Sequence, residues 1–230
     1  MIFELVGPAG AGKTTLVRRL AAELEEVGVR TSLRHGLGWK GAEERLRRED
    51  PTMWQECCTA LDAVLAHRVA QGHGSPRRLR VETHGLWFDR VLSARLARSK
   101  DVPVLFEESV LHELCRISFL LREHPDRSRL VRTLRRHVPL PDRVLVIEAP
   151  PAERVGRIAG KAARGPVNEE LLRHPWDGPV WSAADREYRR LVRSTTFLRT
   201  RVHRVSNPDE RSFERAARRV LELVEEALVS

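Results

Sequence analysis

Long apolar runs are missing from this chain of 230 residues, and cysteines are few. No stretch approaches the ~20 apolar residues of a transmembrane helix. Glu4 interrupts the apolar run near the N-terminus, so neither a membrane partner nor a secretory signal is expected. The three cysteines, Cys57, Cys58 and Cys115, lack the spacing of a zinc site. They fit small core residues in a reducing cytoplasm, the compartment that we predict.

Lysine and aromatic residues are also scarce. Among the 41 basic residues only Lys13, Lys40, Lys100 and Lys161 are lysines, so the net charge of +9 comes from arginine. The arginines are spread over nearly every predicted helix, and aromatic residues make up only 5% of the chain. Nucleic-acid-binding proteins gather their basic residues into a patch or stripe. The scattered charge therefore argues against a nucleic-acid partner.

The segment Gly7–Thr15 is the most informative part of the chain. It joins the apolar run 2–6 to a helical pattern that begins at Leu16. It has the form G-x-x-x-x-G-K-[ST] of a P-loop, in which glycines let backbone N–H groups turn toward phosphate oxygens. We expect Lys13 to reach the β- and γ-phosphates of a nucleoside triphosphate, and the Thr14 hydroxyl to bind Mg²⁺. The predicted nucleotide-binding residues are Gly7, Ala9, Gly10, Ala11, Gly12, Lys13, Thr14 and Thr15.

Apolar runs of strand length alternate with helical patterns, which is typical of a parallel sheet with crossover helices. The third and fourth runs are almost continuously apolar, as in strands that are buried on both faces. The predicted fold class is therefore α/β: a P-loop NTPase with a doubly wound, five-stranded parallel sheet flanked by helices. The predicted strands are 2–6, 29–33, 102–106, 143–147 and 201–205. The predicted helices are 13–27, about 42–48, 51–70, about 86–99, and a last one to about 229, which Asn207 or Asp209 is expected to cap.

Two acidic residues follow the third predicted strand. Ligands of parallel α/β sheets bind beyond the carboxyl ends of the strands. Phosphoryl transfer needs a carboxylate there, to hold Mg²⁺ or its waters or to accept the proton of the acceptor hydroxyl. Glu107 and Glu108 are both predicted metal ligands, and Glu107, which continues the strand directly, is the predicted catalytic carboxylate. The alternative is an acidic first turn that complements a helix dipole.

A row of cations lies in the predicted helix that follows the fourth strand and a Pro-Pro turn. They recur at steps of three and four residues, which places them near one face of the helix; they are Arg154, Arg157, Lys161 and Arg164. We interpret this segment as an arginine-bearing lid that brings guanidinium groups onto the transferring phosphate. Arg157 and Arg164 are the predicted catalytic residues, together with Lys13. A solvated helix face is the alternative.

Together these pieces resemble the thymidylate kinase branch of the P-loop nucleoside and nucleotide kinases. The likeness rests on residues 3–15, on the strand ending in Glu107-Glu108-Ser109, on residues 141–143, on the helix after Pro150-Pro151, and on Asp185–Leu191. The resemblance implies a five-stranded parallel sheet, Mg²⁺-dependent transfer of the ATP γ-phosphate, and a lid over the phosphates. Two departures concern the acceptor. Glu108 stands where family members have an arginine, and Leu33–Gly38 replaces an acidic-proline segment.

We predict one P-loop kinase-like domain over residues 1–230, with a helical acceptor-side insert at about 36–100 and a lid region at about 150–180. The predicted cofactors are ATP and Mg²⁺, and the partners are a nucleoside triphosphate and a small-molecule acceptor; a homodimer is left open. The favoured function is a kinase acting on a hydroxyl of a nucleoside, nucleotide or other metabolite. Alternatives are a regulatory P-loop NTPase that acts on a protein partner and a polynucleotide-end kinase. Weaker candidates for acceptor contacts are Trp54, Glu82, His84, Trp87 and Asp89.

Overall fold

The structure, a computed structural model, describes residues 1–33, 39–72, 74–100, 102–107, 109–162, 186, 201–207, 209 and 211–229. By its internal contacts the chain divides into two compact units. We call residues 1–2, 34–102 and 108–141 the helical unit, and residues 3–33, 103–107 and 142–230 the sheet unit. Each unit is described by itself below.

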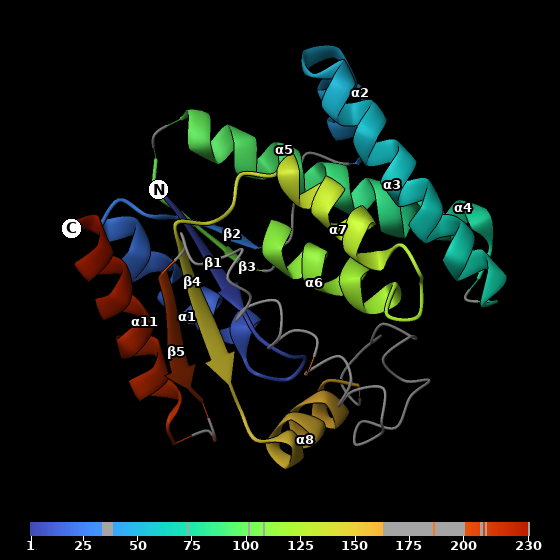
Figure 1. The fold of residues 1–230 in the computed structure, drawn as a ribbon. Helices are drawn as coiled ribbons and strands as arrows, with labels where there is room; N and C mark the ends of the chain where they lie inside the picture. The colour runs from blue at the N-terminus through green and yellow to red at the C-terminus, as the bar shows by residue number, and fades with distance from the viewer. Residues whose placement is uncertain are drawn as a thin grey trace. The chain divides into compact units, whose positions relative to one another are not determined.

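The sheet unit is built on a parallel sheet of five strands in the order β2-β3-β1-β4-β5 (Figure 1). The predicted parallel sheet is therefore confirmed. The bounds of the first strand match the predicted ones, and those of the other strands differ by one or two residues at one or both ends; the third strand includes Glu107 as its last residue. The strands are β1 (Ile2–Val6), β2 (Arg30–Leu33), β3 (Val104–Glu107), β4 (Arg143–Glu148) and β5 (Arg201–Ser206).

The strand register brings the carboxyl ends of the strands to one edge of the sheet. β1 and β3 are buried along their whole length, which explains their nearly continuous apolar sequences. Val6 at the end of β1 lies opposite Val146 of β4, and Glu148 at the end of β4 lies opposite Ser206 of β5. The segments that follow these strands therefore start close together.

Three described helices belong to the sheet unit: α1 (Lys13–Glu26), α8 (Pro151–Ala162) and α11 (Phe213–Leu228). α1 packs against β2 and α11 (Figure 1). An ion pair between Arg19 and Glu214 joins the two helices. The apolar side chains of α1 recur at helical spacing and are buried, as those of an amphipathic helix are; they are Leu16, Val17, Leu20 and Leu24. Ser212, and not Asn207 or Asp209, stands at the N-cap of α11, so that expectation was wrong.

The helical unit contains seven described helical segments. They are α2 (Trp39–Glu49), α3 (Pro51–Ala70), α4 (Pro76–Arg80), the π-helical turn η1 (Val81–Gly85), α5 (Leu86–Ser99), α6 (Val110–Leu120) and α7 (Arg127–Arg136). The bounds of α3 and α5 match the predicted ones. The helical stretch before Leu86 was not predicted, although Ser75 caps it and Pro76 fills its first position. All three cysteines are buried and none of them is in a disulfide bond, as expected.

Among the described helices, none combines the length and the apolar character that crossing a bilayer requires.

Candidate functional site

The turn between β1 and α1 depends on glycine at two positions. Gly10 and Gly12 have φ angles of +78° and +97°, which side chains rarely adopt. A Cβ atom at Gly10 would lie 2.7 Å from the backbone oxygen of Arg154, and one at Gly12 would lie 2.5 Å from Nδ2 of Asn207. Both positions are therefore closed to larger residues, by conformation and by neighbouring atoms.

Lys13 is folded into the P-loop. It is the first residue of α1, and its side chain is only 5% exposed. Its Nζ donates hydrogen bonds to the backbone oxygens of Gly7, at 2.7 Å, and of Pro8, at 3.1 Å. The ammonium group thus lies inside the curve of the loop and at the positive end of a helix, a setting that favours an anionic ligand.

Thr14 and Glu107 meet across the sheet edge. The Thr14 hydroxyl donates a hydrogen bond to Oε1 of Glu107, which ends β3. Glu107 is 2% exposed, and its second oxygen, Oε2, has no hydrogen-bond partner among the described residues. A buried carboxylate with an unused oxygen calls for a cation or a donor.

This pair fits a magnesium site. Mg²⁺ takes oxygen ligands and is usually held by one or two carboxylates plus substrate phosphates. The described residues contain no group of three or more His, Cys, Asp or Glu side chains that could hold a metal ion. Glu108, the other predicted metal ligand, lies outside the described residues.

The first turns of α8 lie against the P-loop. Arg154 is 5% exposed and donates from Nε to the backbone oxygen of Ala9 at 3.0 Å. Nη1 of Arg157 lies 3.4 Å from the backbone oxygens of both Gly10 and Ala11, and its Nε donates to Glu153 at 3.2 Å. Arg157 is thus close to the loop, where the sequence predicted a working arginine. Its role stays a prediction, and Arg164 lies outside the described residues.

Asn207 is the residue of the site that sequence reasoning missed. It directly follows β5, is 1% exposed, and donates from Nδ2 to the backbone oxygen of Ala11 at 2.8 Å. The only signal in the sequence is a polar residue at the carboxyl end of a parallel strand, where ligand-site residues gather. The sequence pattern predicts a helix cap at this position instead.

Together these contacts supply hydrogen-bond donors to successive carbonyl groups of the P-loop. The backbone oxygens of residues 7 to 11 all accept hydrogen bonds from side chains, which belong to Lys13, Arg154, Arg157 and Asn207. Three of these donors are cations. The loop is therefore bound from outside by α8 and by the turn after β5, and its backbone is fixed before any ligand arrives.

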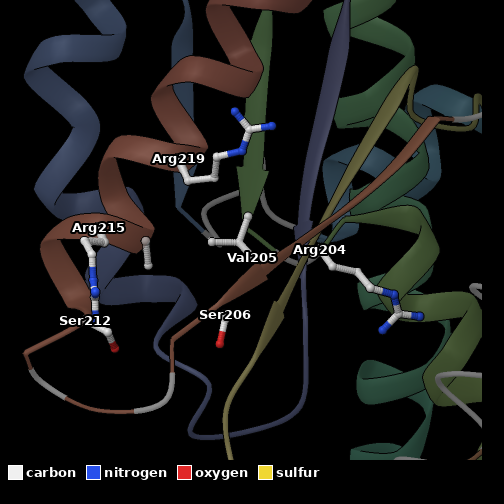
Figure 2. A pocket seen from close by; sticks show the side chains of 7 residues that line it. Arg204, Val205, Ser206, Ser212, Arg215 and Arg219 are labelled. Atoms are coloured by element: carbon white, nitrogen blue, oxygen red, sulfur yellow. The ribbon is translucent and has the colours of Figure 1, made fainter.

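A separate pocket of about 270 Å³ lies between β5 and α11 (Figure 2). It is lined by Arg204, Val205, Ser206, Ser212, Arg215, Ala216 and Arg219. Arg204 pairs with Glu148, and Arg219 pairs with Glu222 at 3.0 Å. In Figure 2 the labelled guanidinium groups point in different directions. The pocket therefore does not gather its positive charge on one point.

In the helical unit, Glu82, a candidate acceptor contact, forms ion pairs with two arginines. Glu82 accepts hydrogen bonds from Nη1 of Arg68 at 3.1 Å and from Nε of Arg78 at 2.8 Å. Burial alone would raise the pKa of Glu82, but these two arginines outweigh burial and lower it. Trp87, a candidate for stacking on an acceptor ring, is fully buried. Both side chains therefore serve the packing of this unit.

His84 lies in the π-helical turn η1 and is almost fully buried. Its Nε2 is 2.9 Å from Oδ1 of Asp62. Burial lowers the pKa of His84, and the neighbouring carboxylate of Asp62 compensates only in part. The lowered pKa favours the neutral imidazole near pH 7, and its contact with Asp62 is internal to this unit.

Comparison with known proteins agrees with this geometry. A family model described as an AAA domain matches residues 2–180. The chain is also similar to the solved structure of deoxyadenosine kinase from M. mycoides with bound dATP: the identity is 15%, the TM-score is 0.56, and each chain is covered to 100%. A thymidylate kinase from Ehrlichia chaffeensis is 12% identical, with a TM-score of 0.52 and 98% of each chain covered. No curated protein sequence matches the chain. The resemblance to P-loop nucleoside and nucleotide kinases is thus confirmed at the level of the fold.

Proposed function

The chain belongs to the AAA domain family, and from this premise we propose that it is an ATP- and Mg²⁺-dependent small-molecule kinase. It transfers the γ-phosphate to a hydroxyl of a nucleoside, a nucleotide or another metabolite. One observation carries the proposal: the buried carboxylate of Glu107 contacts the P-loop hydroxyl of Thr14, and its other oxygen has no hydrogen-bond partner in the part of the chain that the structure describes. The similar folds of a deoxyadenosine kinase and a thymidylate kinase support nucleosides and nucleotides as the first acceptors to test.

The donor side consists of the P-loop and α1. The backbone of residues 7–15 surrounds the phosphates, and the ammonium group of Lys13 moves from the carbonyls of Gly7 and Pro8 to the β- and γ-phosphate oxygens. Thr14 and Glu107, with Glu108 as a further candidate, hold Mg²⁺. When bound, this ion neutralises charge on the phosphates.

Arg157 neutralises the charge that develops on the transferring group. Its contacts with the loop oxygens are at the long end of hydrogen bonding, at 3.4 Å each, so leaving them for a phosphate costs little. Arg164 is proposed to act beside it. Glu107 has two candidate roles in addition to structure: it holds the metal, or it accepts the proton of the acceptor hydroxyl.

The test is a transfer assay with purified protein, γ-labelled ATP, Mg²⁺ and a panel of nucleosides, nucleotides and sugars. We expect a labelled product with at least one acceptor, and strongly reduced transfer for Lys13→Ala and Glu107→Gln. Lys100→Ala and Glu123→Gln are matched controls at exposed positions of the helical unit. Tight binding of ATP without transfer to any acceptor, together with hydrolysis that a protein partner stimulates, would instead support the regulatory NTPase.

The remaining sequence-based assignments belong to this proposal. The free, buried cysteines suit a reducing cytoplasm. Residues 36–100 as the acceptor side and 150–180 as the lid region stay predictions, as does a homodimer.

A further inference from the structure

The turn after β5 is attached to the P-loop through one side chain. Asn207 donates from Nδ2 to the backbone oxygen of Ala11 at 2.8 Å, and its backbone N–H donates to the oxygen of Glu148 at 2.8 Å. The side chain is 1% exposed. Asn207 therefore joins the ends of β4 and β5 to the loop, although it lies 196 residues from Ala11 in the sequence.

Asn207 also lies close to Gly12, the N-cap residue of α1. Its Nδ2 would be 2.5 Å from a Cβ atom at Gly12, and Gly12 is the N-cap of α1 in the left-handed conformation. Ala11 and Gly12 are consecutive, so one amide group donates to the carbonyl before the N-cap and occupies the space where a side chain on the N-cap residue would begin. This contact fixes the backbone immediately before Lys13.

The backbone oxygen of Ala11 has a second hydrogen-bond donor, Arg157, whose contact is longer than that of Asn207. Arg157 reaches this oxygen at 3.4 Å, shares Nη1 with Gly10, and is also paired with Glu153. Ala11 is fully buried, and a buried carbonyl without a partner is costly. If Arg157 leaves for a phosphate, Asn207 is the donor that keeps this carbonyl satisfied.

We propose that Asn207 is a positioning residue, which holds Ala11 and Gly12 in the conformation that binds a triphosphate. It acts through the loop and does not touch the phosphates. The affinity for the triphosphate group therefore depends on the turn that follows β5. This inference rests on the proposed function only in taking the P-loop as the phosphate site.

The variants that test it are Asn207→Asp and Asn207→Ala. The first is nearly isosteric and replaces the donor by an acceptor facing a carbonyl; the second removes the amide and covers the case in which the first does not fold. Asp209→Ala is the matched control, because Oδ1 of Asp209 accepts from the backbone N–H of Ser212 at 2.7 Å in the same turn. It loosens the turn without touching the P-loop.

Two measurements are made well below the melting temperature. The first is hydrogen–deuterium exchange of peptides covering residues 6–16, without ligand. The second is calorimetric binding of tripolyphosphate and of ATP, each with Mg²⁺. We expect faster exchange in residues 6–16 for both Asn207 variants, and binding of both ligands weakened by about five- to tenfold, the effect of one lost hydrogen bond. Asp209→Ala should change neither.

The results separate the candidate roles of Asn207. A lower melting temperature with unchanged P-loop exchange and unchanged tripolyphosphate affinity makes Asn207 a structural residue and overturns the proposal. Weaker binding of ATP with unchanged binding of tripolyphosphate also overturns it, since Asn207 would then contact the nucleoside part through Oδ1, which has no partner among the described residues. If the wild-type protein binds neither ligand, the proposed function fails, and the exchange data alone decide whether Asn207 holds the loop.

Discussion

Replacing Gly12 by alanine should destabilise the protein more than the same change at Gly28. Both glycines are in the left-handed region, at φ +97° and +78°, and each borders one end of α1. A Cβ atom at Gly28 would meet nothing within 4 Å, whereas one at Gly12 would lie 2.5 Å from Nδ2 of Asn207. The pair therefore separates backbone strain from steric conflict.

The magnitudes follow from these two terms. Left-handed strain costs an alanine roughly 1–2 kcal/mol, which is the whole expected loss for Gly28→Ala. Gly12→Ala adds the displacement of Asn207 from the oxygen of Ala11, a buried hydrogen bond whose loss costs about 1–3 kcal/mol. We expect Gly12→Ala to lower the free energy of unfolding by about 2–5 kcal/mol, at least about 1 kcal/mol more than Gly28→Ala.

Urea unfolding followed by far-UV circular dichroism measures both losses. In an Asn207→Ala background the conflict is already relieved, so the two glycine substitutions should differ by less than about 0.5 kcal/mol. Equal losses for Gly12→Ala and Gly28→Ala in the wild-type background would contradict a steric conflict with Asn207. It would mean that the loop moves away from Asn207 at no cost.

Three further predictions concern single side chains. Lys13→Ala should weaken the binding of ATP with Mg²⁺ by roughly 10- to 100-fold in calorimetry, because a charged hydrogen-bond donor to phosphate is lost; unchanged affinity would contradict its place in the donor site. The pKa of Glu82 is lowered from 4.5, so the ionised group stabilises the folded state above that pH, and this contribution is lost as the pH falls through the lowered value. In urea unfolding at pH 7, the wild-type protein should therefore have a larger free energy of unfolding than Glu82→Gln, and the difference should shrink below about pH 4. A difference that does not depend on pH would be evidence against the ion pairs. Burial raises the pKa of the Cys57 thiol to about 12, so its reaction with Ellman's reagent at pH 8 should be at least ~100-fold slower in the folded protein than in urea, and similar rates would mean that the thiol is accessible.

The predictions that the structure confirmed depend on neighbours in the sequence. The strand before Gly7 and the helix after Gly12 follow from the alternation of apolar and polar residues, which acts over a few positions. The role of Glu107 stays a prediction, based on its place at the end of an apolar run; its contact with Thr14 follows from the parallel arrangement of β1 and β3 in one sheet. The helical segment 76–85 was missed because its polar residues carry no clear periodicity, although Ser75 and Pro76 are a recognisable start.

The fold class and the P-loop could be predicted from the sequence, because both are encoded in short, continuous patterns. The side chains that hold the P-loop could be identified only from the folded chain. Arg154 and Asn207 lie 145 and 196 residues from the carbonyls that they contact, and nothing in the local sequence distinguishes either from a surface arginine or a helix cap. Their roles arise because parallel strands bring segments from distant parts of the chain to one edge, where each buried carbonyl must find a donor.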